Sequence, residues 1–345
     1  MKKPKPVKFT KQKWVRVVAV ILAILGTIFV IFALLYAFVF TPVKNPRYGV
    51  SFVKERAEEY DLDWRENYLA LLDDLKIRNF RLVSYWSAHE PKRGEFDFSA
   101  LDWQMDEAAK RGAKVSLSIG MRQPRWPECH EPGWAHLLGG HEWKQALYAY
   151  MEIVVNRYKN HPALESYQLE NEAVNNWFGT CREPDRERLI EEFNFVKQWD
   201  PNHPIYMSLS DQHGIPVNQP VPDKYGYSVY RWLWNDKTVP NGYILYPTPI
   251  WYHRLRAEVI KLTKNRDIFI HELQMEPWGP EETKNLSIEE QNRSMSVDQI
   301  PKSFDFGRRI GSPDISLWGG EWWYWRKVNG DASIWEKVRE QLNAP

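Results

Sequence analysis

From Tyr48 to the C-terminus the sequence alternates between short apolar runs and longer amphipathic segments, and this alternation constrains the fold most strongly. The short runs have the length of buried strands, and the longer segments carry apolar residues at helical spacing, as Leu69, Leu72 and Leu75 do. The predicted strands are 48–53, 79–85, 114–119, 164–169, 205–208, 225–230, 268–271 and 315–317. The predicted helices are 63–76, 99–112, 141–158, 184–199, 250–264, 297–311 and 332–342.

The connection 211–223 is rich in proline and has no helical period, so the fifth helix is predicted to be missing or reduced. Eight strands and their helices in about 300 residues predict an α/β fold, a single (β/α)₈ TIM barrel over 48–345. A doubly wound open sheet is the alternative. It would need fewer repeats and usually has a glycine-rich first turn.

The N-terminal segment has a different composition. Residues 1–16 carry seven Lys or Arg and no acid, and residues 17–40 carry no charge. The uncharged run is long enough to cross a bilayer with some tilt. Because a cleavable signal peptide has a shorter apolar core and a small-residue cleavage site, the run predicts an uncleaved transmembrane helix. The positive-inside rule then places the basic tail in the cytoplasm, with 41–47 as a linker to an extracytoplasmic barrel.

Two of the predicted strands end at a carboxylate. The run 164–169 is followed by Glu170, Asn171 and Glu172, and the run 268–271 is followed by Glu272. Strands of a parallel barrel present their C-terminal ends to one cleft, so these side chains are expected to meet there. A pair of carboxyl groups in one cleft is the equipment of glycoside hydrolysis. Either residue alone would be read as a solvated strand end, and only the pair indicates catalysis.

The composition fits a carbohydrate ligand and argues against nucleic acid as a partner. The formal net charge is only +1, whereas phosphate binding needs a basic face. Many of the 18 Trp stand in Gly-, Pro- and charge-rich segments at predicted strand ends, where a core does not need them. Flat aromatic faces in a cleft pack well against sugar rings. The sequence has no evident cluster with metal-ligand spacing, and no cofactor is expected.

The segment Phe80-Arg-Leu-Val-Ser-Tyr-Trp-Ser-Ala-His-Glu-Pro91, continued by Gly94-Glu-Phe-Asp-Phe98, stands at the end of the second strand. Together with Asn171-Glu172 after strand four and Glu272 at strand seven, it resembles the clan A glycoside hydrolases, a retaining group built on the (β/α)₈ barrel. The resemblance covers roughly 48–343, and its motifs do not distinguish families within the clan. It implies that Glu172 is the acid/base and that Asn171 binds the sugar 2-hydroxyl.

The same resemblance implies that Glu272 is the nucleophile and that Arg81 keeps it ionised. Two rivals remain for the catalytic roles. Glu170 alternates with Glu172 along the strand and is expected to point the same way, which would also supply negative charge to the acid. Glu276 precedes Pro277 in the loop after strand seven and rivals Glu272 as nucleophile.

Other polar and aromatic side chains near strand ends are expected to bind the sugar or orient the site. By the resemblance, the strand-six tyrosine would hydrogen-bond the nucleophile and a tryptophan after strand eight would form the floor of the central subsite. The tryptophans after strands three and four, Trp126 and Trp177, are expected to form sugar platforms or merely to fix their loops. His89 and Glu90, after strand two, are expected to orient the site. The set is Trp86, His89, Glu90, Trp126, Trp177, Tyr230, Glu276, Trp318 and Trp322.

The two cysteines, Cys129 and Cys181, follow strands three and four and therefore lie in adjacent loops on the catalytic face. A disulfide is permitted outside the cytoplasm, and we predict one between them. The sequence as a whole predicts a membrane-anchored retaining glycoside hydrolase acting on an extracytoplasmic glycan. The alternatives are a transglycosylase that uses the same residues and a catalytically silent carbohydrate-binding barrel.

Overall fold

The computed structural model describes residues 11–39, 41–173, 175, 179–182, 185–209, 214–236 and 242–344. The chain divides into two compact units, Met1–Pro42 and Val43–Pro345. The described part of the first unit is dominated by one helix, α1 (Lys11–Val39). Its segment Lys13–Phe32 is long and apolar enough to cross a membrane, a property that signal sequences share.

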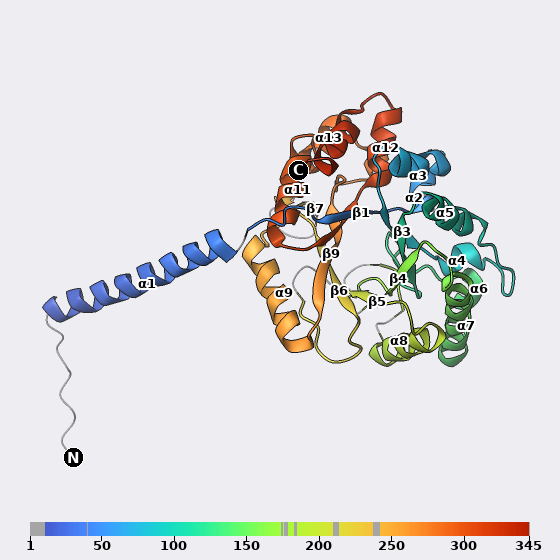
Figure 1. Ribbon diagram of the computed structural model, residues 1–345, viewed down its shortest axis with the longest axis horizontal. Helices are drawn as coiled ribbons and strands as arrows, with labels where there is room; N and C mark the ends of the chain where they lie inside the picture. Colours follow the sequence, from blue (N-terminus) through green and yellow to red (C-terminus); the bar gives the residue numbers. More distant parts are fainter. Residues whose placement is uncertain are drawn as a thin grey trace, which may run out of the picture. The chain divides into compact units, whose positions relative to one another are not determined.

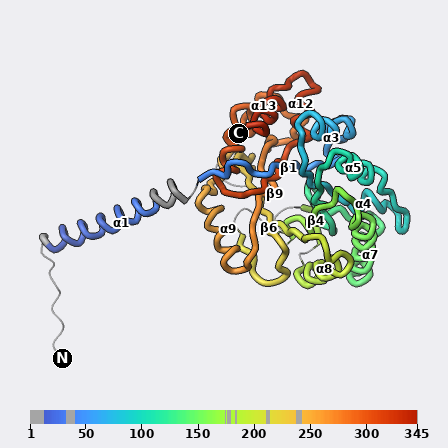
Figure 2. The backbone as a smooth tube through the Cα atoms, viewed as in Figure 1, coloured from blue at the N-terminus to red at the C-terminus, as the bar shows by residue number. Residues whose placement is uncertain are grey.

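The second unit is a closed barrel of parallel strands surrounded by helices (Figure 1). The strands are β1 (Arg47–Ser51), β2 (Asn79–Val83), β3 (Lys114–Ile119), β4 (Leu164–Leu169), β5 (Ile205–Ser208), β6 (Lys224–Val229), β9 (Asp267–Gln274) and β10 (Asp314–Trp318). They pair in the order β1-β10-β9-β6-β5-β4-β3-β2, and β1 pairs with both β10 and β2. The first strand of the second unit therefore lies beside its last barrel strand (Figure 2). The predicted (β/α)₈ fold is confirmed.

Helices follow the strands along the chain and cover the outside of the barrel (Figure 1). The longer ones are α3 (Trp64–Asp73), α5 (Ser99–Lys110), α7 (Gly140–Tyr158), α8 (Arg186–Trp199), α9 (Ile250–Lys264), α11 (Gln299–Ile310) and α13 (Ser333–Leu342). Shorter ones are α2 (Lys54–Glu59), α4 (Trp86–His89), α6 (Gly133–His136), the 3₁₀ turn η1 (Thr283–Asn285), α10 (Ile288–Ser294) and α12 (Gly320–Val328). Between β5 and β6 the described residues 209 and 214–223 form no helix, in agreement with the proline-rich sequence.

Local sequence explains both the start of α3 and the face that it buries. The Asp63 side chain accepts hydrogen bonds from the backbone N–H groups of Arg65 (2.8 Å) and Glu66 (3.2 Å), which otherwise lack partners at a helix start. Tyr68 and Leu72 recur at helical spacing and are fully buried. Each such side chain contributes about 1.5–3 kcal/mol through the apolar surface that it removes from water.

Ion pairs link the strands at the N-terminal end of the barrel. Arg47 Nε lies 2.8 Å from Asp314 Oδ1, and Arg47 Nη1 lies 2.5 Å from Glu165 Oε1. Lys224 Nζ lies 2.7 Å from the other oxygen of Asp314. These contacts join β1, β4, β6 and β10. Because they are partly exposed, they fix the register of the strands more than they stabilise the fold.

Two features near the C-terminal ends of the strands differ from the prediction. The seventh barrel strand does not stop at His271 but continues to Gln274, because Leu273 and Gln274 pair with β10. Glu272 therefore lies inside the strand rather than after it. The segment after β6 also contains an unpredicted antiparallel pair, β7 (Trp232–Asn235) and β8 (Gly242–Leu245).

A disulfide joins Cys129, in the loop after β3, to Cys181, in the loop after β4. The two Cα atoms are 5.2 Å apart, and the bond spans a sequence separation of 52 residues. It ties together two loops on the C-terminal side of the barrel.

We expect the double substitution Cys129→Ser with Cys181→Ser to lower the free energy of unfolding by about 2–4 kcal/mol, because an unfolded chain without this cross-link has more conformations. Urea unfolding of the oxidised protein and the variant measures the difference. Equal midpoints and slopes would contradict the expectation. The reduced wild type should behave like the variant.

Candidate active site

A cleft of about 660 Å³ opens where the barrel strands end. Parallel strands bring their last residues to one face, so side chains far apart in the sequence meet here. The main lining residues are Asn171 and Glu172 after β4, Ser228 and Tyr230 at the end of β6, Glu272 and Gln274 in β9, Trp318 in β10, and Arg125, Trp126 and Glu128 in the loop after β3.

Glu272 is buried, and both of its carboxylate oxygens have partners. Arg81 Nη2, from β2, donates to Oε1 at 2.7 Å, and the Tyr230 hydroxyl donates to Oε2 at 2.7 Å. Burial by itself favours the neutral acid, but the positive charge of Arg81 and the bond from Tyr230 outweigh it and hold the pKa of Glu272 below its usual value. Glu272 is therefore an ionised carboxylate with a fixed orientation.

Arg81 reaches Glu272 through the barrel interior and has partners on other strands. Its Nε donates to Ser51 Oγ (2.9 Å), and its Nη1 donates to Gln168 Oε1 (3.2 Å) and to His271 Nδ1 (2.6 Å). Because a guanidinium can only donate, His271 Nδ1 must accept, which assigns the ring proton to Nε2. Burial lowers the pKa of His271 to about 3, so the ring is neutral.

A chain of hydrogen bonds continues from His271 to Glu172. His271 Nε2 lies 3.2 Å from Ser228 Oγ, and this hydroxyl donates to Glu172 Oε1 at 2.7 Å. With the proton on Nε2, the imidazole donates to the serine oxygen and leaves the hydroxyl proton for Glu172. Ser228 is also the register partner of Glu272 in the β6–β9 pairing, so the two glutamates meet at one point of the barrel rim.

Glu172 is buried and has a second polar contact to its carboxyl group. Asn175 Nδ2 donates to Glu172 Oε2 at 3.2 Å, and the Glu172 backbone N–H donates to Ser208 Oγ at 2.7 Å. Burial, and then the negative charge of Glu272, raise the pKa of Glu172 to about 7. A carboxyl protonated near neutrality beside one that is ionised can divide the roles of acid and nucleophile.

The expectation that Glu170 points the same way as Glu172 is wrong. Strand alternation ends at Leu169, since Glu170 and Glu172 both have left-handed backbones, with φ of 49° and 45°. The Glu170 carboxylate accepts from the backbone N–H groups of Met121 (2.8 Å) and Arg122 (2.9 Å). Arg188 Nη1, which also pairs with Glu192, lies 3.0 Å from Glu170 Oε1. Glu170 therefore holds the loop after β3 and does not line the cleft.

Glu276 lines the cleft but is bound by a cation other than Arg81. Arg125 pairs with both of its oxygens and also with Glu321 Oε2 at 3.2 Å. The Arg125 guanidinium stacks over the Trp318 ring, 4.0 Å from its centroid. Arg125 and Trp318 both line the cleft that Glu272 also lines. Among the described residues, the Glu276 carboxylate pairs with Arg125 and has no hydrogen bond or ion pair to Glu172.

Asn171 and Glu128 form a second polar pair in the cleft. Asn171 Nδ2 donates to Glu128 Oε2 at 3.1 Å, while Asn171 Oδ1 accepts from Gln168 Nε2 at 3.0 Å. Sequence reasoning missed Glu128, which belongs to no motif. The only available signal was its position next to Cys129, since the predicted disulfide brings this loop to the catalytic face.

Two exposed aromatic rings lie at the cleft. Trp126 is 69% exposed and Trp278 is 46% exposed, and both line the cavity. Trp318 lines the cleft but is nearly buried, with the guanidinium groups of Arg81 and Arg125 over its ring, and its role as the floor of the central subsite stays a prediction. Trp278 was not among the candidates predicted from the sequence, although it follows Glu276 closely. Trp177, a predicted platform, lies outside the described residues.

Trp86 and Trp322 were predicted to bind substrate, and the structure contradicts both predictions. Both rings are fully buried and neither lines the cleft. Trp86 Nε1 donates to Glu90 Oε2 (2.7 Å), and Trp322 Nε1 donates to Gln291 Oε1 (2.8 Å). Glu90 also accepts from the Gly94 backbone, so it fixes the loop after β2 instead of contacting substrate.

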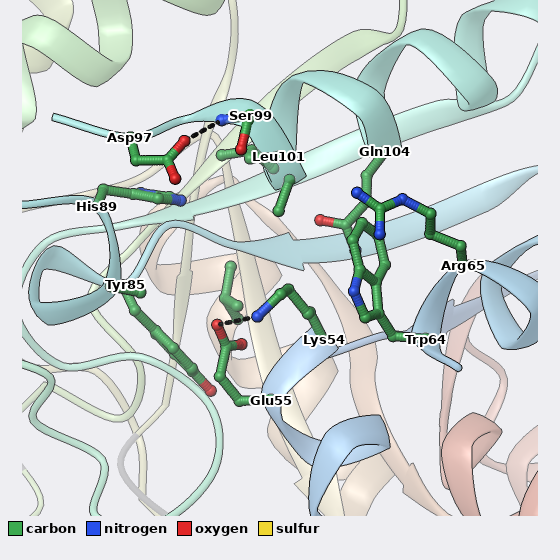
Figure 3. Close-up of a pocket in the computed structure, with 13 residues that line it drawn as sticks. Lys54, Glu55, Trp64, Arg65, Tyr85, His89, Asp97, Ser99, Leu101 and Gln104 are labelled. Atoms are coloured by element: carbon green, nitrogen blue, oxygen red, sulfur yellow. Dashed lines mark hydrogen bonds and ion pairs between the residues drawn. The ribbon is translucent and has the colours of Figure 1, made fainter. Parts of the chain in front are cut away.

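His89 lies in a separate polar pocket, and none of its described lining residues also lines the cleft (Figure 3). Asp97, Lys54 and Glu55 face the same space. His89 Nδ1 is 2.9 Å from the Tyr150 hydroxyl. Burial lowers the pKa of His89 to about 4, and the neutral ring packs against the loop after β2. The predicted site role of His89 is therefore corrected to a structural one.

Comparison with known proteins gives matches to glycoside hydrolases. A family model described as Glyco_hydro_42, beta-galactosidase, matches residues 57–134. Mannan endo-1,4-beta-mannosidase F of Aspergillus fumigatus is 26% identical over 162 residues, which are 43% of this chain and 35% of that protein. The chain thus spans about a third of the length of this relative.

Solved structures share the fold at low identity. A GH5_18 protein from Streptomyces cattleya, solved in complex with GlcNAc, has a TM-score of 0.56 at 13% identity, over 88% of this chain and 82% of that one. An exo-beta-1,4-mannosidase, Op5Man5 from an Opitutaceae bacterium, has a TM-score of 0.53 at 16% identity, over 79% and 51%. The resemblance to clan A glycoside hydrolases that the motifs indicate is confirmed.

Removing Arg81 should destabilise the fold, because Glu272 would be left as a buried charge without its cation. We expect Arg81→Met to lower the free energy of unfolding at pH 7 by about 3 kcal/mol or more, measured by urea unfolding. Arg93→Met is the matched control, since Arg93 pairs with Glu142 on the surface and such pairs contribute about 0–1 kcal/mol. Similar losses in the two variants would contradict the importance of the buried pair.

Proposed function

We propose that this protein is a retaining glycoside hydrolase with Glu272 as nucleophile and Glu172 as acid/base. The observation that carries the proposal is the difference between two buried carboxyl groups in one cleft. Arg81 and Tyr230 favour the ionised form of Glu272, whereas burial and the charge of Glu272 favour the protonated form of Glu172. This is the division of labour that double displacement at a glycosidic bond requires.

In the first step a Glu272 oxygen attacks the anomeric carbon, the glycosidic C–O bond breaks, and the Glu172 proton passes to the leaving oxygen. In the second step Glu172, now a base, takes a proton from water, whose oxygen attacks the same carbon and releases Glu272. Retention requires carboxyl groups about 5–5.5 Å apart. The bond from Ser228, the strand neighbour of Glu272, to Glu172 supports a short separation.

The charge of the cleft supports a neutral glycan as substrate. Its described lining has six acids and two bases. Those residues are Glu128, Glu172, Glu272, Glu276, Glu281 and Glu282 with Arg56 and Arg125. Even without Glu128 and Glu172, whose pKa values burial raises, the acids outnumber the bases, which disfavours uronate-rich or phosphorylated glycans. The similar proteins named above include two mannosidases, and the matching family model is described as beta-galactosidase, so β-mannosides and β-galactosides are the first substrates to test. The exposed rings of Trp126 and Trp278 would pack against further sugar units.

We also propose that the protein acts outside the cytoplasm while anchored by α1. The seven cations of residues 1–16 favour a cytoplasmic tail, and the uncharged run 17–40 favours insertion. A disulfide between two loops of the barrel is typical of oxidising compartments.

The kinetics of two variants should separate the catalytic roles. Glu272→Ala should lower kcat by about 10⁴-fold or more on every substrate, because no covalent intermediate can form. Azide should partly restore turnover and give a glycosyl azide of inverted configuration. Glu172→Ala should keep the first step for aryl glycosides with good leaving groups, which need no protonation, and azide should give the retained product.

Glu276→Ala is the control for the nucleophile assignment, since Glu276 lines the same cleft. If this variant, and not Glu272→Ala, gave the inverted azide, the assignment of the nucleophile would be wrong. Normal hydrolysis by both Glu172→Ala and Glu272→Ala would overturn the proposed function. Transfer of the glycosyl group to an added sugar, in place of water, would identify a transglycosylase.

The anchor can be tested by fractionation of cells that express the full chain. We expect the protein to stay with membranes after alkaline carbonate extraction and the barrel to be digested by protease added outside intact cells. Residues 43–345 expressed alone should be released into the soluble fraction. A mature protein whose N-terminal sequence begins beyond residue 40 would identify a cleaved leader and contradict the anchor.

A further inference from the structure

Glu128 is a third carboxyl group in the cleft, and the mechanism above does not use it. It lies in the loop between β3 and α6 and is more than nine-tenths buried, although it lines the cavity with Glu172 and Glu272. A buried acid costs free energy unless its environment compensates, so its presence in the cleft needs an explanation.

The loops around Glu128 hold its side chain in one position. Its backbone has φ of 71°, a left-handed conformation that is unfavourable for a residue with a side chain. The next residue, Cys129, is bonded to Cys181. Gly179 passes so close that a Cβ added there would lie 2.9 Å from the Cβ of Glu128. The stem of Glu128 is thus enclosed by both loops that the disulfide connects.

The two oxygens of Glu128 have different surroundings. Oε2 accepts from Asn171 Nδ2 at 3.1 Å and lies 3.9 Å from Arg122 Nη2. Oε1 has no hydrogen-bond partner in the part of the chain that the structure describes. Because Glu128 lines the cleft, Oε1 is available to a ligand in the cleft.

We propose that Glu128 is a specificity-determining residue that hydrogen-bonds the 2-hydroxyl of the glycone sugar through Oε1, beside Asn171. The inference rests on the proposed function, which places the anomeric carbon between Glu172 and Glu272. The 2-hydroxyl is on the carbon next to the anomeric carbon. Asn171, the residue before Glu172, donates a hydrogen bond to Glu128. The substrate class is therefore a neutral glycoside with a free 2-hydroxyl.

The protonation of Glu128 fits this role. Burial raises its pKa to about 8; the Arg122 charge and the Asn171 bond oppose the shift, and the charges of Glu272 and Glu172 add to it. At neutral pH one oxygen accepts from Asn171 and the other carries a proton that it can donate to the sugar oxygen. A glutamine would keep the same pattern of one acceptor and one donor.

The test compares kcat/KM for an aryl glycoside of the hydrolysed sugar with kcat/KM for its 2-deoxy analogue. The measured quantity is kcat/KM for the glycoside with the 2-hydroxyl divided by kcat/KM for the 2-deoxy analogue. Because this ratio is compared between wild type and variant, the different intrinsic reactivity of the two glycosides cancels. Glu128→Met, which keeps the shape but forms no such bond, should lower this ratio about tenfold or more relative to wild type. Glu128→Gln should keep the ratio within a few-fold.

Glu95→Gln, in the exposed ion pair with Lys92, is the control and should keep the wild-type ratio. If Glu128→Met lowers both constants equally and leaves the ratio unchanged, Glu128 has only a structural role and the proposal is overturned. If Glu128→Met does not fold, Glu128→Ala takes its place, and an unchanged ratio in Glu128→Ala overturns the proposal as well. If the wild-type protein hydrolyses no glycoside, the ratio cannot be measured, and this result contradicts the proposed function rather than the role of Glu128.

Discussion

The arrangement of the site depends on the ion pair between Arg81 and Glu272 inside the barrel. Both side chains are about 5% exposed, so the cost of removing two charges from water has to be offset by further bonds. Those bonds come from Ser51 in β1, Gln168 in β4 and Tyr230 after β6. Closure of the barrel brings these strands together, and the same closure therefore orients the carboxylate that faces the cleft.

The fold and the two glutamates could be predicted because both depend on simple periodic patterns. Short apolar runs alternate with amphipathic segments along 48–345, and parallel strands must end on one face. Glu172 and Glu272 then have to share that face. The strand ends themselves were less predictable. Glu170 turns away from the cleft because its backbone is left-handed, and a single sequence does not reveal where strand alternation stops.

Side chains whose role depends on tertiary packing could not be assigned from the sequence. Trp86 and Trp322 stand beside strand ends, as platform residues do, yet each is buried with its indole N–H bonded inside the protein. Trp278, by contrast, was not predicted as a site residue, yet its ring is exposed at the cleft. Glu128 is placed by a left-handed backbone and a disulfide, neither of which leaves a motif. These residues differ in burial, which propensity and spacing do not specify.

The pairing of β1 with β10 has a consequence for the order of folding. Arg47 bonds to Asp314, a partner 267 residues away, and all of β1 pairs with the last barrel strand. Contacts this distant in sequence form late, because a long loop must close before they provide any stabilisation. Until β10 has been synthesised, one edge of β1 has no partner and is open to pairing with other chains. Synthesis must therefore proceed through β10 before this edge of β1 is protected from aggregation.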